Sequence, residues 1–449
     1  MKKISAFLTL SLLPGLVPAM SAMGPGKVST AARLLVPVRV LKASPGAAQG
    51  ASVWKSTEEY NAYIAMANEK DPQKKISLAE AFLAKYTDSA PAVKSLAYAA
   101  MMNAYQQLGN TTKAVDTARK VLEIDPNSLD ALRYLSFVFP FTFKPDSANA
   151  SAELSRAESD ARHGLEALAK LAKPANVSDE QFNQAIKPLR DIFNNAVGFV
   201  ALQRKDYPGA ITSFKAALED NPSDLYAAYR MGVAYLLSSP ADYNNGLWYL
   251  SRAVAVGKAS NTSDTGGIEK YLNQAYVNYH GNEEGLADII AQAATSPNPP
   301  SDFQVAAIKP PEKTGNPNVD NFNQVTFPLK LGGSRAQQAW SQLKGQPLGL
   351  GGFVNSVEKG EDAGTYIVRI ALDQARASSG FDIELKDSSQ PKASDLGEGD
   401  PVRFQGTISA YTATPTFSLM LEDGRINDDD LESASQKAKA GPRRRRPGK

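Results

Sequence analysis

Apolar and small residues recur at helical spacing through the first two thirds of the chain. In the clearest segment, residues 194–222, Ala210, Phe214 and Ala217 precede a proline at intervals of 4, 3 and 5 residues. Intervals of three and four residues place side chains on one helix face, and proline ends a helix. Gly198 lies on the preceding helix, where a small residue lets two helices approach closely. The pattern predicts two antiparallel helices joined by a turn.

The same residue spacing recurs on both sides of this segment. Upstream, the three intervals are repeated by Ala114, Ala118, Val121 and Pro126. Downstream, Gly232 leads into another unit with a lengthened turn. Less regular units occupy Thr57–Tyr86 and Ile268–Ala293. These residues resemble tetratricopeptide repeats, in which terminal units of a stack are often irregular. We expect an all-α tetratricopeptide (TPR) solenoid of antiparallel helical hairpins over residues 56–293. A generic helical bundle is the alternative.

Tetratricopeptide repeats are known as solenoids that bind proteins and peptides, and the first helix of each hairpin lines their concave surface. The resemblance therefore implies a groove for an extended segment rich in polar and aromatic groups. Family members that clamp a carboxylate terminus use many lysines and arginines, so that specialised activity is not expected here. Burial between repeats explains each aromatic side chain equally well. The expected groove residues are Asn103, Gln106, Gln107, Asn195, Phe199, Gln203, Tyr226, Tyr229 and Arg230.

The period of the pattern changes to two near the C-terminus. Prolines, glycines and polar residues accumulate first, which predicts a linker over residues 294–335. Alternating stretches then predict five strands: Leu348–Val357, Tyr366–Leu372, Phe381–Leu385, Val402–Tyr411 and Phe417–Leu421. Residues 399–408 and 417–424 resemble the last hairpin of an OB-type barrel, and the expected OB-like module spans residues 336–427. The fold class is thus a multidomain chain, an α-solenoid followed by a small all-β barrel. A generic barrel or sandwich is the alternative.

The two ends of the chain are expected to be extensions of the folded body. Lys2 and Lys3 precede a short apolar run and small residues at 18–22, the three parts of a secretory signal sequence. We therefore expect a signal peptide at 1–22, a flexible leader at 23–55, and export to the periplasm or the medium. Residues 428–449 predict a disordered basic tail, which contains Arg443, Arg444, Arg445 and Arg446. This run offers a weak contact for polyanions.

The amino-acid composition limits the kinds of catalytic and metal site that the chain can form. The chain has no cysteine and two histidines, which excludes thiolate and imidazole-rich metal sites and leaves few ways to build a nucleophile. We expect no enzyme activity, no cofactor and no metal. The expected function is a non-catalytic scaffold of the bacterial cell envelope that binds protein or peptide segments. The alternative is polyanion or oligonucleotide binding by the barrel and the tail, although nucleic acid is an improbable partner for an exported chain. A carboxylate hydrolase and a glycan binder stay open.

Overall fold

The chain folds into two compact units. The computed structural model describes residues 53–387, 390–413 and 416–440. A helical unit comprises residues 53–272 and 287–304, and a barrel unit comprises residues 273–286 and 305–440, so their boundary falls within helix α12 (Thr265–His280). In this described part of the chain, every helix is too short or too polar to span a lipid bilayer.

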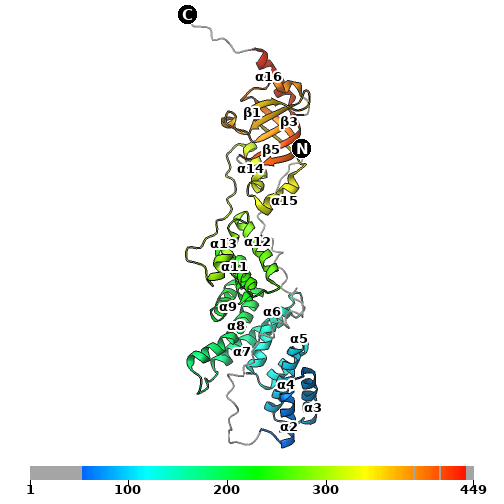
Figure 1. The fold of residues 1–449 in the computed structure, drawn as a ribbon, viewed down its shortest axis with the longest axis vertical. Helices are drawn as coiled ribbons and strands as arrows, with labels where there is room; N and C mark the ends of the chain where they lie inside the picture. Colours follow the sequence, from blue (N-terminus) through cyan, green and yellow to red (C-terminus); the bar gives the residue numbers. More distant parts are fainter. Residues whose placement is uncertain (1–52, 388–389, 414–415, 441–449) are drawn as a thin grey trace. The chain divides into compact units, whose positions relative to one another are not determined.

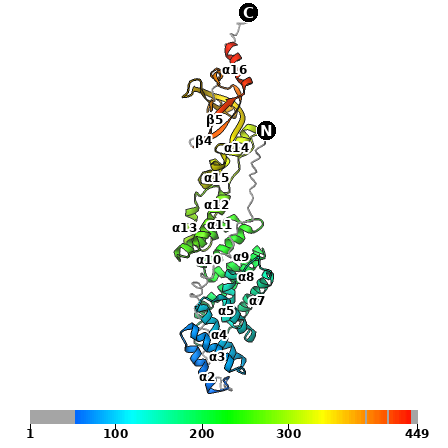
Figure 2. The ribbon, with the colours of Figure 1, turned by 90° about the vertical axis from the view of Figure 1, so that its right-hand side faces the viewer.

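The helical unit is a succession of antiparallel helices. It contains α2 (Thr57–Asn68), α3 (Pro72–Lys85), α4 (Pro91–Gln107), α5 (Thr111–Ile124), α6 (Leu129–Thr142), α7 (Ala150–Ala169), α8 (Asp179–Gln203), α9 (Tyr207–Asp220), α10 (Leu225–Leu237), α11 (Tyr243–Ala259), the start of α12, and α13 (Leu286–Thr295). From α2 to α11 each helix packs against the next one along the chain, as the colour order from blue to green shows (Figures 1 and 2). This nearest-neighbour packing is that of a helical solenoid and confirms the predicted fold class.

Four hairpins start their second helix in the same way, and in the first of them Asp71 caps α3 by accepting the N–H of Lys74. Asn110, Asp206 and Asp242 cap α5, α9 and α11, and each side chain accepts a hydrogen bond from the backbone N–H three residues later. In the α4–α5 and α8–α9 turns, the residue before the cap also has a left-handed backbone: φ is 69° at Gly109 and 63° at Lys205. The cap thus recurs in all of these hairpins, and the turn geometry recurs in two of them.

The predicted close approach of α8 and α9 is present. A Cβ atom added to Gly198 would lie 2.7 Å from the ring of Phe214, which is fully buried. Ala210 and Ala217 are also fully buried in this seam. The spacing that identified the hairpin in the sequence therefore reflects helix–helix packing.

The barrel unit is built around five strands. They are β1 (Pro347–Lys359), β2 (Tyr366–Ala371), β3 (Ile383–Asp387), β4 (Pro401–Thr412) and β5 (Ser418–Ile426). The sheet closes in the order β1-β2-β3-β5-β4, with β3 and β5 parallel and all other pairs antiparallel. A closed five-stranded barrel confirms the predicted small all-β barrel, and each expected strand is present.

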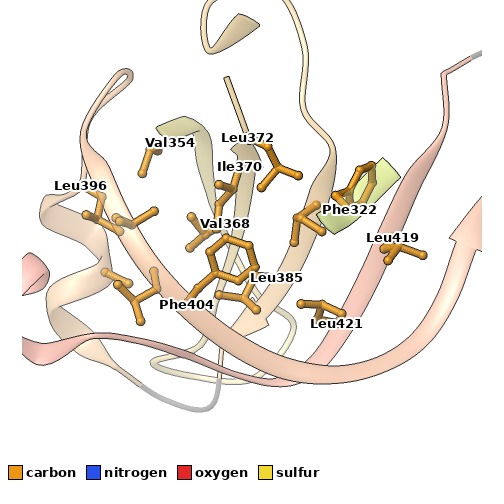
Figure 3. Packing of buried hydrophobic residues seen from close by; sticks show 14 of the residues in the cluster. Phe322, Val354, Val368, Ile370, Leu372, Leu385, Leu396, Phe404, Leu419 and Leu421 are labelled. Carbon is orange, nitrogen blue, oxygen red and sulfur yellow. The ribbon is translucent and has the colours of Figure 1, made fainter. Parts of the chain in front are cut away.

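The inside of the barrel is filled by alternate residues of the strands. On β4, Val402 and Phe404 are buried and the intervening Arg403 is exposed. Figure 3 shows Phe404 among side chains from the other strands, with Phe322 of a preceding helix at the edge of the cluster. The barrel core therefore extends beyond the strands.

The predicted linker at 294–335 is wrong in its second half. Helix α14 (Pro317–Lys330) lies there, and α15 (Gly333–Leu343) begins there. Asn316 accepts a hydrogen bond from the N–H of Asn318 at the N-terminus of α14, and Pro317 occupies the first helical position. Phe322, Thr326 and Leu329 are buried at helical spacing. The abundance of proline and polar residues concealed this short amphipathic helix.

The prediction of disorder at 428–449 is also wrong over its first thirteen residues, which form helix α16 (Asp428–Ala440). Its three N-terminal aspartates favour a helix because they face the positive end of the helix dipole. Leu431 and Ala434 are buried against the barrel core, and Asp430 pairs with Arg403 at 2.8 Å. Residues 441–449, including the four consecutive arginines, lie outside the described residues.

The predicted signal peptide at 1–22 and most of the leader at 23–55 also lie outside the described residues. The end of that leader packs on the helical unit. Trp54 contacts the rings of Tyr60 and Tyr63 at centroid distances of 5.4 and 4.9 Å, and Lys55 pairs with Asp88 at 2.6 Å. These contacts place the start of the folded body before residue 56.

Candidate functional site

The nine predicted groove residues fall into two groups by accessibility. Four are buried: Asn195, Phe199, Tyr229 and Arg230. Asn103 and Gln107 are exposed, and Gln106, Gln203 and Tyr226 are half-buried. All nine lie on α4, α8 and α10, the first helices of their hairpins, as the sequence predicted. Only the accessible group is placed to meet a partner directly.

Arg230 lies at the centre of an aromatic cluster that joins α6, α8 and α10. Its guanidinium carbon is 5.5 Å from the ring centre of Phe141, 5.2 Å from that of Phe199 and 5.6 Å from that of Tyr226. The residue is only 2% exposed, and its Nε and Nη2 atoms have no hydrogen-bond partner among the described residues. The three ring faces thus provide the main favourable surroundings of the charge.

Burial lowers the pKa of Arg230 to about 10, although Asp224 acts in the opposite direction. The guanidinium therefore stays positive at neutral pH, inside the fold. Phe141 belongs to the cluster but not to the predicted groove. Sequence reasoning missed this residue, and the signal that marks it is four phenylalanines at alternate positions from 137 to 143.

A network of two acids and two amides adjoins the start of α10. Asn195 Nδ2 donates to Asp191 Oδ1 at 3.0 Å and to Asp224 Oδ2 at 2.6 Å. Asn221 Nδ2 donates to Asp191 Oδ2 at 2.9 Å. Asp224 Oδ1 also accepts the backbone N–H groups of residues 226 and 227, so it caps α10. The network fastens α8 to the α9–α10 turn.

The network places two acidic side chains next to each other, one of them on the largely buried helix α8. Burial, and after it the charge of the adjacent Asp224, raise the pKa of Asp191 to about 8. Asp191 therefore keeps its proton at neutral pH, since burial and a neighbouring carboxylate both disfavour its charged form. Asn195 Oδ1 has no partner among the described residues. The predicted groove residue Asn195 thus has a role in packing and capping.

Tyr226 closes the same region towards α12. Its hydroxyl donates to Asp264 Oδ2 at 2.7 Å, and burial together with this hydrogen bond raises the pKa of Tyr226. Tyr229 lies edge-on to Tyr271 at a centroid distance of 6.1 Å. These contacts hold both tyrosines within the helical unit.

Two arginines on the barrel strands, Arg369 on β2 and Arg403 on β4, are paired with acids. Arg369 pairs with Glu358 and, at 3.1 Å, with Glu384. Arg403 pairs with Asp430 at 2.8 Å. Both guanidinium groups therefore already have carboxylate partners, which makes them less available to a polyanion. The ring of Phe404 is buried in the barrel, whereas Phe417 is only half-buried.

The histidines contact amide and carbonyl oxygens. His163 Nε2 is 2.8 Å from Asn127 Oδ1, and His280 Nδ1 is 3.0 Å from the carbonyl oxygen of Ala306. These are contacts that stabilise turns and packing.

Comparison of the chain with protein-family models gave no match. Comparison with curated protein sequences likewise gave no match. The candidate site is therefore defined by its geometry alone.

Proposed function

We propose that the chain is a non-catalytic scaffold of the bacterial cell envelope whose tetratricopeptide-type hairpins bind an extended protein or peptide segment. The observation that carries this proposal is the repetition of one capped hairpin along the helical unit. Such a stack presents its first helices side by side as a continuous surface.

The accessible amides on that surface suit an extended segment. Asn103 and Gln107 are exposed on α4, and Gln203 is half-buried on α8. Amide side chains both donate and accept hydrogen bonds, which matches the alternating N–H and C=O groups of a peptide backbone. The buried cluster around Arg230 acts beneath this surface by fixing the angle between α6, α8 and α10.

Site-specific photo-cross-linking tests this proposal. A photoreactive residue replaces Asn103 or Gln107 in the full chain, expressed in its native cell, and Asp116 on the outer helix α5 receives the same residue as a matched control, since it is also exposed. The expected result is capture of a defined protein at 103 and 107 and not at 116. Equal capture at all three positions, or capture of nothing at 103 and 107, contradicts the proposal.

The proposed location rests on the N-terminal sequence and has its own test. Cell fractionation followed by N-terminal sequencing is expected to recover the chain outside the cytoplasm, beginning at residue 22 or 23. Recovery from the cytosol with Met1–Ala22 still attached would overturn export. Binding of a polyanion is the competing function, and loss of such binding on removal of residues 441–449 alone would favour it.

A further inference from the structure

A cleft of about 630 Å³ opens in the barrel unit between α14, the turn after β2 and the segment leading into β5. It lies entirely within this unit, and its floor is apolar, with Phe322 and Leu372 almost fully buried. The volume is in the range of pockets that hold small organic molecules. The cleft is separate from the helical surface considered above.

One cation in this cleft has no acid as a partner. Lys330 Nζ lies over the faces of two rings, 5.3 Å from the centre of Phe322 and 5.1 Å from that of Phe417, and donates to Asn323 Oδ1 at 3.1 Å. Among the described residues it forms no ion pair. Lys330 is exposed as a residue, but loss of water around its ammonium lowers its pKa, while the charge of Asp382 acts in the opposite direction. An anion that reached this ammonium would therefore offset an existing desolvation cost.

The acids of the cleft are already engaged. Asp382 pairs with Arg376 at 2.7 Å and accepts the N–H of Leu372 at 2.9 Å. Asp373 accepts the N–H of Ala375 at 2.8 Å. Because these two carboxylates stay near the cleft, they would repel a ligand with two negative charges. The arrangement favours a single negative charge placed beside Lys330.

The rest of the surface favours a flat ligand. Phe417 is half-buried, so part of its ring faces the cleft, and Val319 and Ala375 add apolar surface. Aromatic rings pair well when they are offset or edge-on. We propose that the cleft binds a small aromatic monocarboxylate, whose carboxylate pairs with Lys330 and whose ring packs on Phe417.

Calorimetric titration of the full chain with 2-naphthoate and with its neutral analogue 2-naphthamide tests this assignment. The acid is expected to bind about tenfold more tightly than the amide, because only the acid forms a charge-assisted hydrogen bond with the ammonium of Lys330. Lys330→Gln is expected to remove this difference, and Phe417→Ala is expected to weaken both ligands. Lys359→Gln, which changes an exposed lysine at the end of β1, is the matched control and should behave as the wild type.

Two results would overturn the proposal. One is equal affinity of the acid and the amide in the wild type, or binding of neither. The other is an unchanged preference for the acid in Lys330→Gln. A thermal unfolding curve for each variant shows whether the barrel unit is still folded. If Lys330→Gln proved unfolded, Lys330→Met would replace it, since a methionine removes the charge and keeps an apolar chain between the two rings.

Discussion

The pKa of Asp191 makes a testable statement about the stability of the helical unit. The carboxyl is 6% exposed, lies beside Asp224, and has a pKa raised from 3.8 to about 8. Between those two values the folded chain holds a proton that the unfolded chain has released. The free energy of unfolding must therefore fall as the pH rises, and it levels off above the folded pKa.

One proton contributes at most about 1.4 kcal/mol per pH unit. Because the proton of Asp191 is released gradually as the pH approaches the folded pKa, we expect a smaller loss, about 2 kcal/mol in all between about pH 5.5 and about pH 7.5. Asp191→Asn places a neutral amide of the same shape at this position. The variant should lose this part of the pH dependence, whatever its absolute stability, because it has no proton to release.

The assay is urea unfolding followed by the fluorescence of Trp248, which is fully buried in α11. Trp54 and Trp340 are replaced by phenylalanine so that the signal reports on the helical unit. Asp116→Asn, at an exposed position on α5, is the matched control. If the free energy of unfolding of Asp191→Asn fell with pH as steeply as that of the parent and the control, the proton on Asp191 would not be the cause of the pH dependence.

Three further substitutions test helix packing and backbone conformation. Gly198→Ala should lower the free energy of unfolding by about 2 kcal/mol, since its Cβ meets the ring of Phe214. Its control is Gly266→Ala, which should be neutral or slightly stabilising in the same urea assay because no atom lies within 4 Å of the new Cβ. Lys205→Gly should stabilise the helical unit by about 1 kcal/mol because φ there is 63°, and an unchanged urea midpoint would contradict this. Leu431→Ala should destabilise the barrel unit by about 2 kcal/mol in thermal unfolding, because Leu431 is buried. Gln436→Ala, at an exposed position on the same helix, is the control and should have no such effect. Equal effects of the two substitutions would mean that α16 adds nothing to the barrel core.

The sequence predicted the parts of the fold that depend on periodic burial. Intervals of 4, 3 and 5 residues marked the hairpin around Gly198, and alternation marked all five strands. Helices α14 and α16 were missed for a common reason. Each buries only a few residues, such as Phe322 or Leu431, so the apolar pattern is short and polar composition dominates. Their stability comes from contact with the barrel, which a local pattern does not contain.

The candidate sites were harder to predict than the fold. Helical spacing placed Asn195 and Arg230 on first helices correctly, yet it could not show that neighbouring helices cover them. Coverage depends on residues far away in the sequence, such as Phe141 and Asp224. Lys330 was missed because its segment was interpreted as a linker. Accessibility of a polar residue is a tertiary property, and its amino-acid type alone does not determine it.

The two proposals concern different residues in different units, so each supplies a control for the other. A chain with Lys330→Gln should still cross-link through Gln107, because α4 belongs to the helical unit and Lys330 to the barrel unit. A chain with Gln107→Ala should likewise keep its preference for 2-naphthoate over 2-naphthamide. If either substitution removed both activities, general unfolding of the chain or a ligand shared by the two surfaces would be the cause. Independent loss is therefore the outcome that supports two binding surfaces on one chain.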